Sequence, residues 1–187
     1  MMKRLFDILF SLSAIVILAL PLCLCALLVK WSSPGPAIYW SRRVGQNDNE
    51  FLMPKLRTMS LDSPELPTHE LHNPERYITG FGRFLRRTSI DETPQFISIL
   101  LGQMSVVGPR PMIPQYFEII EARRKAGVSK LKPGLTGWAQ INGRDGISTD
   151  EKLAFEIEYL KRRSLFFDLV IVFKTVGFVL FGKGIKH

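Results

Sequence analysis

The sequence predicts a mainly helical α+β protein with an apolar helix at each end of the chain. Residues 5–29 form a strongly apolar run, which as a helix of about 37 Å could cross a hydrocarbon core of about 30 Å. Residues 164–182 form a second apolar segment. Between them, the strand-like runs 37–40 and 50–54 flank a polar loop and predict one small β-hairpin. The 187 residues suffice for a compact domain with a membrane anchor.

The flanks of the N-terminal apolar run bear on its topology. Lys3 and Arg4 precede the run and Lys30 follows it, and positive charge on both sides does not choose an orientation. Pro21 interrupts the run. Because proline removes a helical hydrogen bond and clashes with the preceding turn, we expect a bend there. These residues fit a spanning helix and a re-entrant helix equally well.

Two helices of the second half carry clear end signals. Residues 114–126 begin with proline, place acidic side chains early and basic ones late, and are followed by Gly127. Ser148 and Glu151 have the spacing of a capping box, which predicts a helix reaching about Arg163.

The C-terminal apolar segment, residues 164–182, has only a narrow polar stripe that includes Asp168 and Lys174. A charged pair in so short a segment suits a helix lying in the membrane interface better than a second transmembrane span. Membrane signals therefore occur at both ends of the chain.

The composition indicates an anionic partner. Lys and Arg number 25 against 17 Asp and Glu, a net charge of +8, which suits nucleic acid, an acidic membrane surface or a phosphorylated substrate. The basic residues are scattered and match no nucleic-acid-binding motif, so we expect no nucleic acid. Cys23 and Cys25 lie in the apolar run, too close together for a useful disulfide. His69 and His72 have no plausible metal-ligand partners nearby.

The residues of greatest chemical interest are two adjacent carboxylates, Asp91 and Glu92. Thr93 followed by Pro94 predicts an N-cap and the first residue of a helix that continues to Leu101, which would put Asp91 at the mouth of that helix. Three arginines lie just upstream, at positions 83, 86 and 87. The cluster could bind phosphate, or it could be a helix cap with solvated arginines.

Two further stretches could contact a phosphorylated ligand. Lys55 and Arg57 lie on one side of an extended segment, which could equally be a solvated basic edge. Residues 131–144 are expected to form a glycine-containing loop that could wrap a nucleotide, with Trp138 stacking and Arg144 meeting phosphate, or that could be purely structural.

Taken together, these stretches resemble the monotopic phosphoglycosyl transferases, the bacterial sugar transferase family, and the chain is similar in size to the family's smallest members. The matching stretches occur in family order from Lys3 to the C-terminal helix. They are residues 3–7, 33–36, 43–45, 55–59, 91–95, 104–111 and 133–144.

The resemblance implies a fold with a re-entrant membrane helix hairpin over residues 1–31 and a catalytic domain over residues 32–187 on the cytoplasmic face of the bacterial inner membrane. It implies transfer of a sugar-1-phosphate from a UDP-sugar to undecaprenyl phosphate with release of UMP. The implied route is ping-pong, through a phospho-sugar aspartyl intermediate, and the implied cofactor is Mg²⁺. Membrane lipids are implied partners.

The resemblance also assigns site residues. Asp91 corresponds to the nucleophile and metal ligand and Glu92 to its partner, whose role could be to tune Asp91, to hold Mg²⁺ through water or to manage a proton. Arg86 and Arg110 correspond to phosphate-binding cations. The other expected substrate contacts are Lys55, Arg57, Pro109, Pro111, Gln140, Asn142 and Arg144.

The chain departs from the family pattern at two positions. Gln103 occupies a place where the family usually has Asp, which casts doubt on a metal-related role there, and Leu20 precedes Pro21 where a serine is expected. Two rival functions fit the residues as well: a membrane glycosyltransferase that releases UDP, and a non-catalytic membrane-tethered protein that binds anionic ligands. The residues do not indicate which sugar is transferred.

Overall fold

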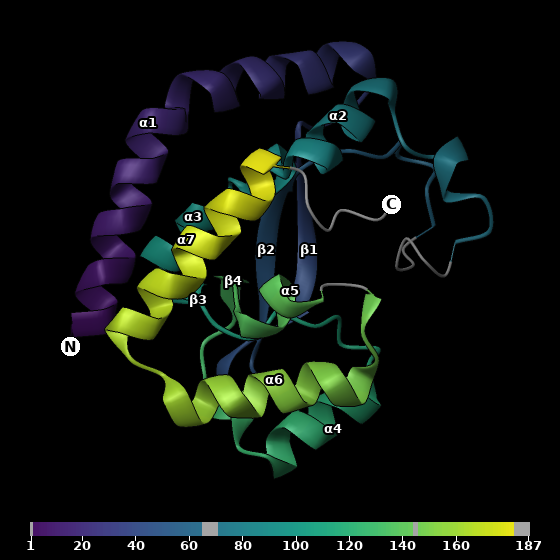
Figure 1. The fold of residues 1–187 in the computed structure, drawn as a ribbon. Coiled ribbons are helices and arrows are strands. Elements are labelled where there is room, and N and C mark those ends of the chain that lie inside the picture. Colours follow the sequence, from purple (N-terminus) through teal and green to yellow (C-terminus); the bar gives the residue numbers. More distant parts are fainter. Residues whose placement is uncertain (1, 65–70, 144–145, 182–187) are drawn as a thin grey trace.

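The computed structural model describes residues 2–64, 71–143 and 146–181, which form helices around two small sheets (Figure 1). The mainly helical α+β prediction is thus confirmed. The helices are α1 (Met2–Ser32), α2 (Gly80–Thr88), α3 (Gln95–Leu100), α4 (Phe117–Lys125), α5 (Trp138–Asn142), α6 (Thr149–Arg162) and α7 (Leu165–Phe181). The strands are β1 (Ile38–Val44), β2 (Glu50–Leu56), β3 (Ser105–Val107) and β4 (Gly134–Thr136).

The predicted hairpin is confirmed and is longer than predicted. β1 and β2 pair antiparallel from Ile38 opposite Leu56 to Val44 opposite Glu50. A short 3₁₀ turn over Gln46–Asp48 connects them. The hairpin carries basic side chains on both strands, and one from each strand, Arg43 of β1 and Lys55 of β2, reaches the candidate site described below.

The prediction of an irregular loop over residues 131–144 is wrong. This stretch contains strand β4, which pairs parallel with β3, and the short helix α5. The backbones of Gly108 and Gly134 approach so closely that a Cβ atom on Gly134 would lie 2.1 Å from the nitrogen of Gly108. These glycines therefore permit the close pairing of β3 and β4. In the sequence, glycines in this stretch suggest a loop.

Helix α1 is the one helix among the described residues that is long and apolar enough to cross a membrane. Figure 1 shows it running up one side of the molecule and then bending across the top. Pro21 lies inside the helix and accounts for the bend. The helix exposes a row of large apolar side chains, which includes Leu5, Leu9, Leu12, Val16, Ile17, Leu20, Leu24, Leu27 and Trp31.

Buried polar contacts hold the first half of α1 against the domain. The carboxylate of Asp7 is buried and accepts hydrogen bonds of 3.0 Å from the Ser105 hydroxyl and from the Val106 amide on β3. Arg4 donates to the carbonyls of the last two residues of α3, at 2.6 and 2.7 Å. The Ile99 carbonyl also accepts from the Gly102 amide at 3.0 Å, so Arg4 adds a second donor at the end of α3. These contacts tie α1 to the same elements that carry the site.

A second contact joins α1 to α7. The ammonium of Lys3 lies 2.6 Å from the buried carboxylate of Asp168, which also accepts a hydrogen bond of 2.7 Å from the Tyr159 hydroxyl. Lys3 further donates to the Val107 carbonyl at 3.1 Å. The two apolar ends of the chain therefore meet at one ion pair.

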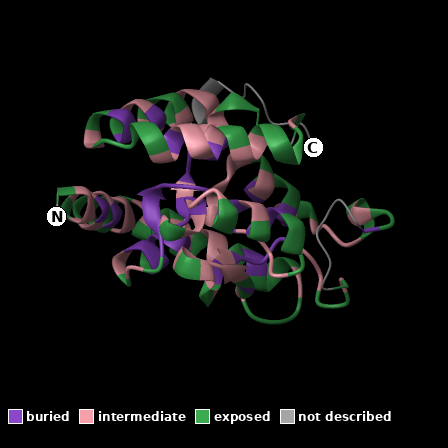
Figure 2. Cartoon of the chain, turned by 90° about the horizontal axis from the view of Figure 1, so that it is seen from below, coloured by how far each residue is buried: buried purple, intermediate pink, exposed green. Residues whose placement is uncertain are grey.

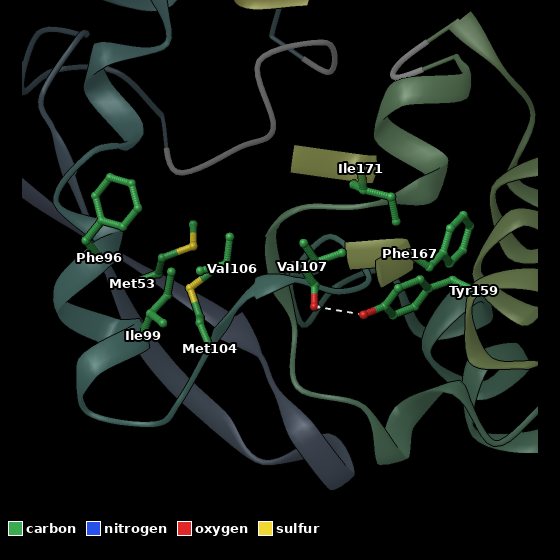
Figure 3. Close-up of a cluster of buried hydrophobic side chains, with 9 residues drawn as sticks. All are labelled: Met53, Phe96, Ile99, Met104, Val106, Val107, Tyr159, Phe167 and Ile171. Atoms are coloured by element: carbon green, nitrogen blue, oxygen red, sulfur yellow. Dashed lines mark hydrogen bonds between the residues drawn. The ribbon is translucent and has the colours of Figure 1, made fainter. Parts of the chain in front are cut away.

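The main core lies where β2, α3, β3, α6 and α7 meet, and Figure 3 shows its side chains. The hydroxyl of Tyr159 donates to the Val107 carbonyl at 3.2 Å within this cluster. Figure 2 shows buried residues between the helices and exposed residues along their outer faces. The buried members are Met53, Phe96, Ile99, Met104, Val106, Val107, Tyr159, Phe167 and Ile171.

Helices α4 and α6, the two predicted from their end signals, largely match their predictions. α6 begins with the predicted capping box, in which the Ser148 amide donates to the Glu151 carboxylate at 2.8 Å and the Glu151 amide donates to the Ser148 hydroxyl at 3.2 Å. α4 begins at Phe117, three residues after the predicted Pro114. The buried Arg123 of α4 pairs with the buried Glu156 of α6 and also donates to the Arg110 carbonyl at 3.0 Å.

The Arg123–Glu156 pair yields a stability prediction. Arg123→Met leaves the Glu156 charge buried and unpaired, so we expect it to lower the free energy of unfolding by about 3–5 kcal/mol. The double variant Arg123→Met/Glu156→Leu removes both charges and should regain most of that loss. Denaturation in detergent measures all three proteins. A double variant no more stable than the single one would contradict this account of the pair.

Candidate active site

Asp91 and Glu92 lie in a 3₁₀ turn, Ile90–Glu92, between α2 and α3. Ser89 adopts a left-handed conformation (φ 56°) that ends α2 and begins this turn. The prediction that Thr93 caps α3 is wrong, because its backbone is already helical and its hydroxyl donates to the Ile90 carbonyl at 2.8 Å. The backbone is therefore helical from the 3₁₀ turn through Thr93 and Pro94, and α3 itself begins at Gln95.

Glu92 is the carboxylate that forms ion pairs with two cations of the site. The ammonium of Lys55, on β2, lies 2.9 Å from Glu92 Oε1. Arg110, which comes from the turn after β3, approaches the same oxygen at 3.4 Å. The side chains of Lys55 and Glu92 are 17% and 21% exposed, so their attraction is only partly screened by water. Contacts from two distant parts of the chain thus converge on one carboxylate.

Asp91 has a different electrostatic environment. Burial, and next the neighbouring charge of Glu92, raise the pKa of the Asp91 carboxyl to about 6, while Lys55 and Arg86 act in the opposite direction. Arg86, on α2, donates to the Thr58 hydroxyl at 2.9 Å, and burial lowers its pKa while Asp91 raises it. Glu92 is thus paired with cations, whereas the pKa of its neighbour Asp91 is raised. Adjacent carboxylates in such different environments are typical of acid–base and nucleophilic sites.

The turn that carries Arg110 is held at consecutive carbonyls. Pro109 accepts from the Gly134 amide at 2.8 Å, Arg110 accepts from Arg123 as described, and Pro111 accepts from Arg43 at 3.3 Å. The turn that contains Pro109 and Pro111, two expected substrate contacts, is therefore fixed to β1, β4 and α4. Its geometry presents the Arg110 guanidinium to Glu92.

A cavity opens beside Glu92, and it contains two residues to which the sequence analysis gave no role. Arg43, on β1, lies in it, and burial foremost, followed by the charge of Arg110, lowers its pKa to about 10. Gln95, the first residue of α3, also lines it. Both belong to stretches that carry the family resemblance, which was the only sequence signal for them. The full lining is Arg43, Met53, Lys55, Glu92, Gln95, Arg110, Pro111, Gly134 and Leu135.

Arg57, a predicted substrate contact, is engaged elsewhere. It is 5% exposed, and its guanidinium donates to the Ser33 carbonyl at 2.8 Å, to the Ser33 hydroxyl at 3.0 Å and to the Pro34 carbonyl. These contacts fasten the turn after α1 to the end of β2. The structure therefore gives Arg57 a positional role in the fold.

The other predicted substrate contacts make local hydrogen bonds. The Gln140 amide donates to the Leu135 carbonyl at 3.4 Å, and the Asn142 amide donates to the Trp138 carbonyl at 2.7 Å. Trp138 itself donates to Glu158 at 2.7 Å. Arg144 lies outside the described residues.

The donor set can be tested for Mg²⁺. Among residues 2–64, 71–143 and 146–181, no group of three or more His, Cys, Asp or Glu side chains could enclose a metal ion. Asp91 and Glu92 offer two hard carboxylates, one of them with a raised pKa that a nearby cation would lower. Mg²⁺ is commonly held by one or two carboxylates together with substrate phosphates, so these residues fit a substrate-shared ion.

Comparisons with known proteins show the family of this chain. The family model described as bacterial sugar transferase matches residues 1–182. The UDP-glucose:undecaprenyl-phosphate glucose-1-phosphate transferase of Escherichia coli strain K12 is 41% identical, over 96% of this chain and 40% of that protein. The exopolysaccharide production protein ExoY of Rhizobium meliloti is 38% identical, over 98% of this chain and 88% of that protein.

The name of a third relative states a different sugar. The UDP-N-acetylgalactosamine-undecaprenyl-phosphate N-acetylgalactosaminephosphotransferase of Aeromonas hydrophila is 32% identical, over 98% of this chain and 45% of that protein. The chain thus spans less than half the length of two of these relatives and most of the other. On the family match over nearly its whole length, the chain belongs to the bacterial sugar transferase family.

Proposed function

We propose that this protein transfers a sugar-1-phosphate from a UDP-sugar to undecaprenyl phosphate, releases UMP and so begins the assembly of a glycoconjugate. The names of the E. coli and Aeromonas relatives state the donor class and the lipid acceptor. The observation that carries the proposal is the site itself, in which Asp91 and Glu92 are adjacent but Glu92 pairs with Lys55 and Arg110 while burial raises the pKa of Asp91.

In the proposed first step, a carboxylate oxygen of Asp91 attacks the phosphorus that bears the sugar. The bond from that phosphorus to the oxygen bridging the two phosphates breaks, and UMP leaves with the electron pair. In the second step, a phosphate oxygen of the lipid attacks the same phosphorus and displaces the Asp91 carboxylate. Arg86 and Arg110 would stabilise the negative charge that develops on the phosphoryl oxygens.

We assign Glu92 an electrostatic role in this cycle. It orients Lys55 and Arg110 through the ion pairs described above. Its negative charge also raises the pKa of Asp91, and a more basic carboxylate is a better nucleophile once it is ionised. Mg²⁺, shared between Asp91 and the donor phosphates, would neutralise phosphate charge when bound.

The contacts of α1 with the domain support the proposed membrane arrangement. The first half of α1 contacts α3, β3 and α7 through Lys3, Arg4 and Asp7. In its last turn, Val29 belongs to a buried cluster with Leu56 of β2 and Leu85 of α2. Both ends of α1 thus contact one domain, whereas a straight spanning helix has its ends on opposite sides of the bilayer. This supports a re-entrant α1 with both flanks at the cytoplasmic face.

The exposed apolar side chains of α7 support an interfacial position for that helix. Phe166, Leu169, Phe173 and Val176 are exposed, and such a face is stabilised by burial at the headgroup boundary. A domain held at the interface in this way could reach the phosphate of an acceptor whose tail stays in the bilayer.

The nucleophile assignment predicts the effect of Asp91→Asn. The amide cannot form the phosphoryl bond, so turnover of UDP-sugar with undecaprenyl phosphate should fall at least about a thousandfold, while the variant still folds and inserts. The measurement is nucleotide release in nanodiscs with Mg²⁺, with UMP and UDP resolved by chromatography. UDP as the product would indicate sugar transfer alone, and a wild-type rate in Asp91→Asn would exclude Asp91 as the nucleophile.

The raised pKa of Asp91 predicts a pH dependence of stability. In the folded protein this pKa is about 6, above the ordinary value of 3.8, so the folded state binds the proton more tightly. Asp91 therefore favours folding below about pH 4, and this contribution is lost as the pH rises through 6. Its full size is on the order of 3 kcal/mol.

Asp91→Asn should accordingly gain stability relative to wild type between pH 4 and pH 8 in metal-free buffer. The measurement is the difference in Tm between the two proteins at each pH, with Glu121→Gln, an exposed acidic position, as the control. A difference that does not change with pH would contradict the raised pKa.

A further inference from the structure

Gln95 is a buried amide whose nitrogen has no hydrogen-bond partner among the described residues. The residue is 3% exposed, and its Nε2 is enclosed without an acceptor. A buried donor left unpaired destabilises the folded state, so such an atom in a cavity indicates a ligand. Gln95 lies three residues after Glu92 and four after Asp91, and it lines the cavity beside Glu92.

The cavity has the charge of an anion site. Arg43 reaches into it from β1, where its guanidinium is held by the Ser41 hydroxyl at 3.0 Å and the Pro111 carbonyl at 3.3 Å, both neutral acceptors. Burial and the nearby Arg110 lower the pKa of Arg43, and the opposing attraction of Glu92 does not offset them. A bound anion would stabilise the Arg43 charge, as the single carboxylate of Glu92 is already shared by Lys55 and Arg110.

The place of the cavity indicates which group of the donor it could receive. Its empty space of about 220 Å³ includes open solvent at its mouth, and Glu92 lies in its lining. Asp91 precedes Glu92 in the same 3₁₀ turn, so the cavity lined by Glu92 is close to Asp91 although Asp91 is not part of its lining. If the sugar-bearing phosphate meets Asp91, the cavity receives the group bonded to it.

We propose that Arg43 and Gln95 form a subsite for the nucleotide-side phosphate of the donor, the group that leaves as the phosphate of UMP. This inference rests on the proposed function. Arg43 supplies charge, and the Gln95 amide donates a directed hydrogen bond to a phosphate oxygen without adding charge. Arg43 of β1, Lys55 of β2 and Gln95 of α3 all line the cavity and would then meet the leaving group.

The test is binding of UMP and of uridine to the full-length protein in nanodiscs with Mg²⁺, by calorimetry and competition. Gln95→Met keeps the length of the side chain and removes the donor, so UMP affinity should fall about 10- to 100-fold, the effect of one hydrogen bond to a charged group. Uridine affinity should stay within about twofold. Gln95→Glu, which adds a negative charge, should weaken UMP binding further.

Gln115→Met is the matched control, because it makes the same change at an exposed position and should leave UMP affinity unaltered. Gln95→Met should unfold at or above the wild-type temperature, since it removes an unpaired buried amide, whereas a structural role predicts a lower one. If Gln95→Met does not fold, Arg43→Met tests the subsite from the other element and should weaken UMP binding at least tenfold.

Unchanged UMP affinity in these variants would overturn the subsite. An equal loss for UMP and uridine would also overturn it, because it would place the Gln95 contact on the uracil base. The proposed function fails separately: it is lost if wild-type protein releases no UMP from any UDP-sugar, whatever the binding results for Gln95 and Arg43.

Discussion

The arrangement of the site depends on Glu92, because that carboxylate brings together cations from separate parts of the chain. Lys55 comes from the hairpin, and Arg110 comes from a turn whose carbonyls are fixed by β1, β4 and α4. Without this anion the two cations would repel each other in a partly buried place. The same negative charge raises the pKa of the adjacent Asp91. One side chain therefore both assembles the positive surroundings of a phosphate and makes its neighbour more basic.

Helix α1 is joined to the same elements that carry the site. Asp7 is buried among donors of β3, and the strand that receives it leads directly into the turn that carries Arg110. Arg57 fastens the turn that follows the other end of α1 to β2, two residues beyond Lys55. Helix α1 is thus connected through the fold to both cations that bind Glu92. In the proposed re-entrant arrangement, this connection would hold the site near the depth of a lipid phosphate.

Local signals predicted the elements well, and tertiary contacts decided what those signals could not. The hairpin and the α6 capping box follow from alternation and spacing of residues that are close in sequence. β4 escaped prediction because its pairing depends on the close approach of Gly108 and Gly134, which are distant in sequence. The sequence itself drew attention to Asp91 and Glu92 as adjacent carboxylates, and the family resemblance assigned their roles. The burial of Arg57 and the unpaired Nε2 of Gln95 are consequences of packing, and no sequence pattern reports them.

The central claim is that Asp91 carries the sugar-phosphate covalently. The most direct measurement incubates the protein in nanodiscs with Mg²⁺ and a panel of UDP-sugars without lipid acceptor, and follows released nucleotide together with intact mass and peptide mapping. The account predicts one equivalent of UMP per protein and a phospho-sugar mass on the peptide containing Asp91, which disappears when undecaprenyl phosphate is added. Turnover with lipid in the absence of any burst or adduct would contradict it and indicate direct transfer.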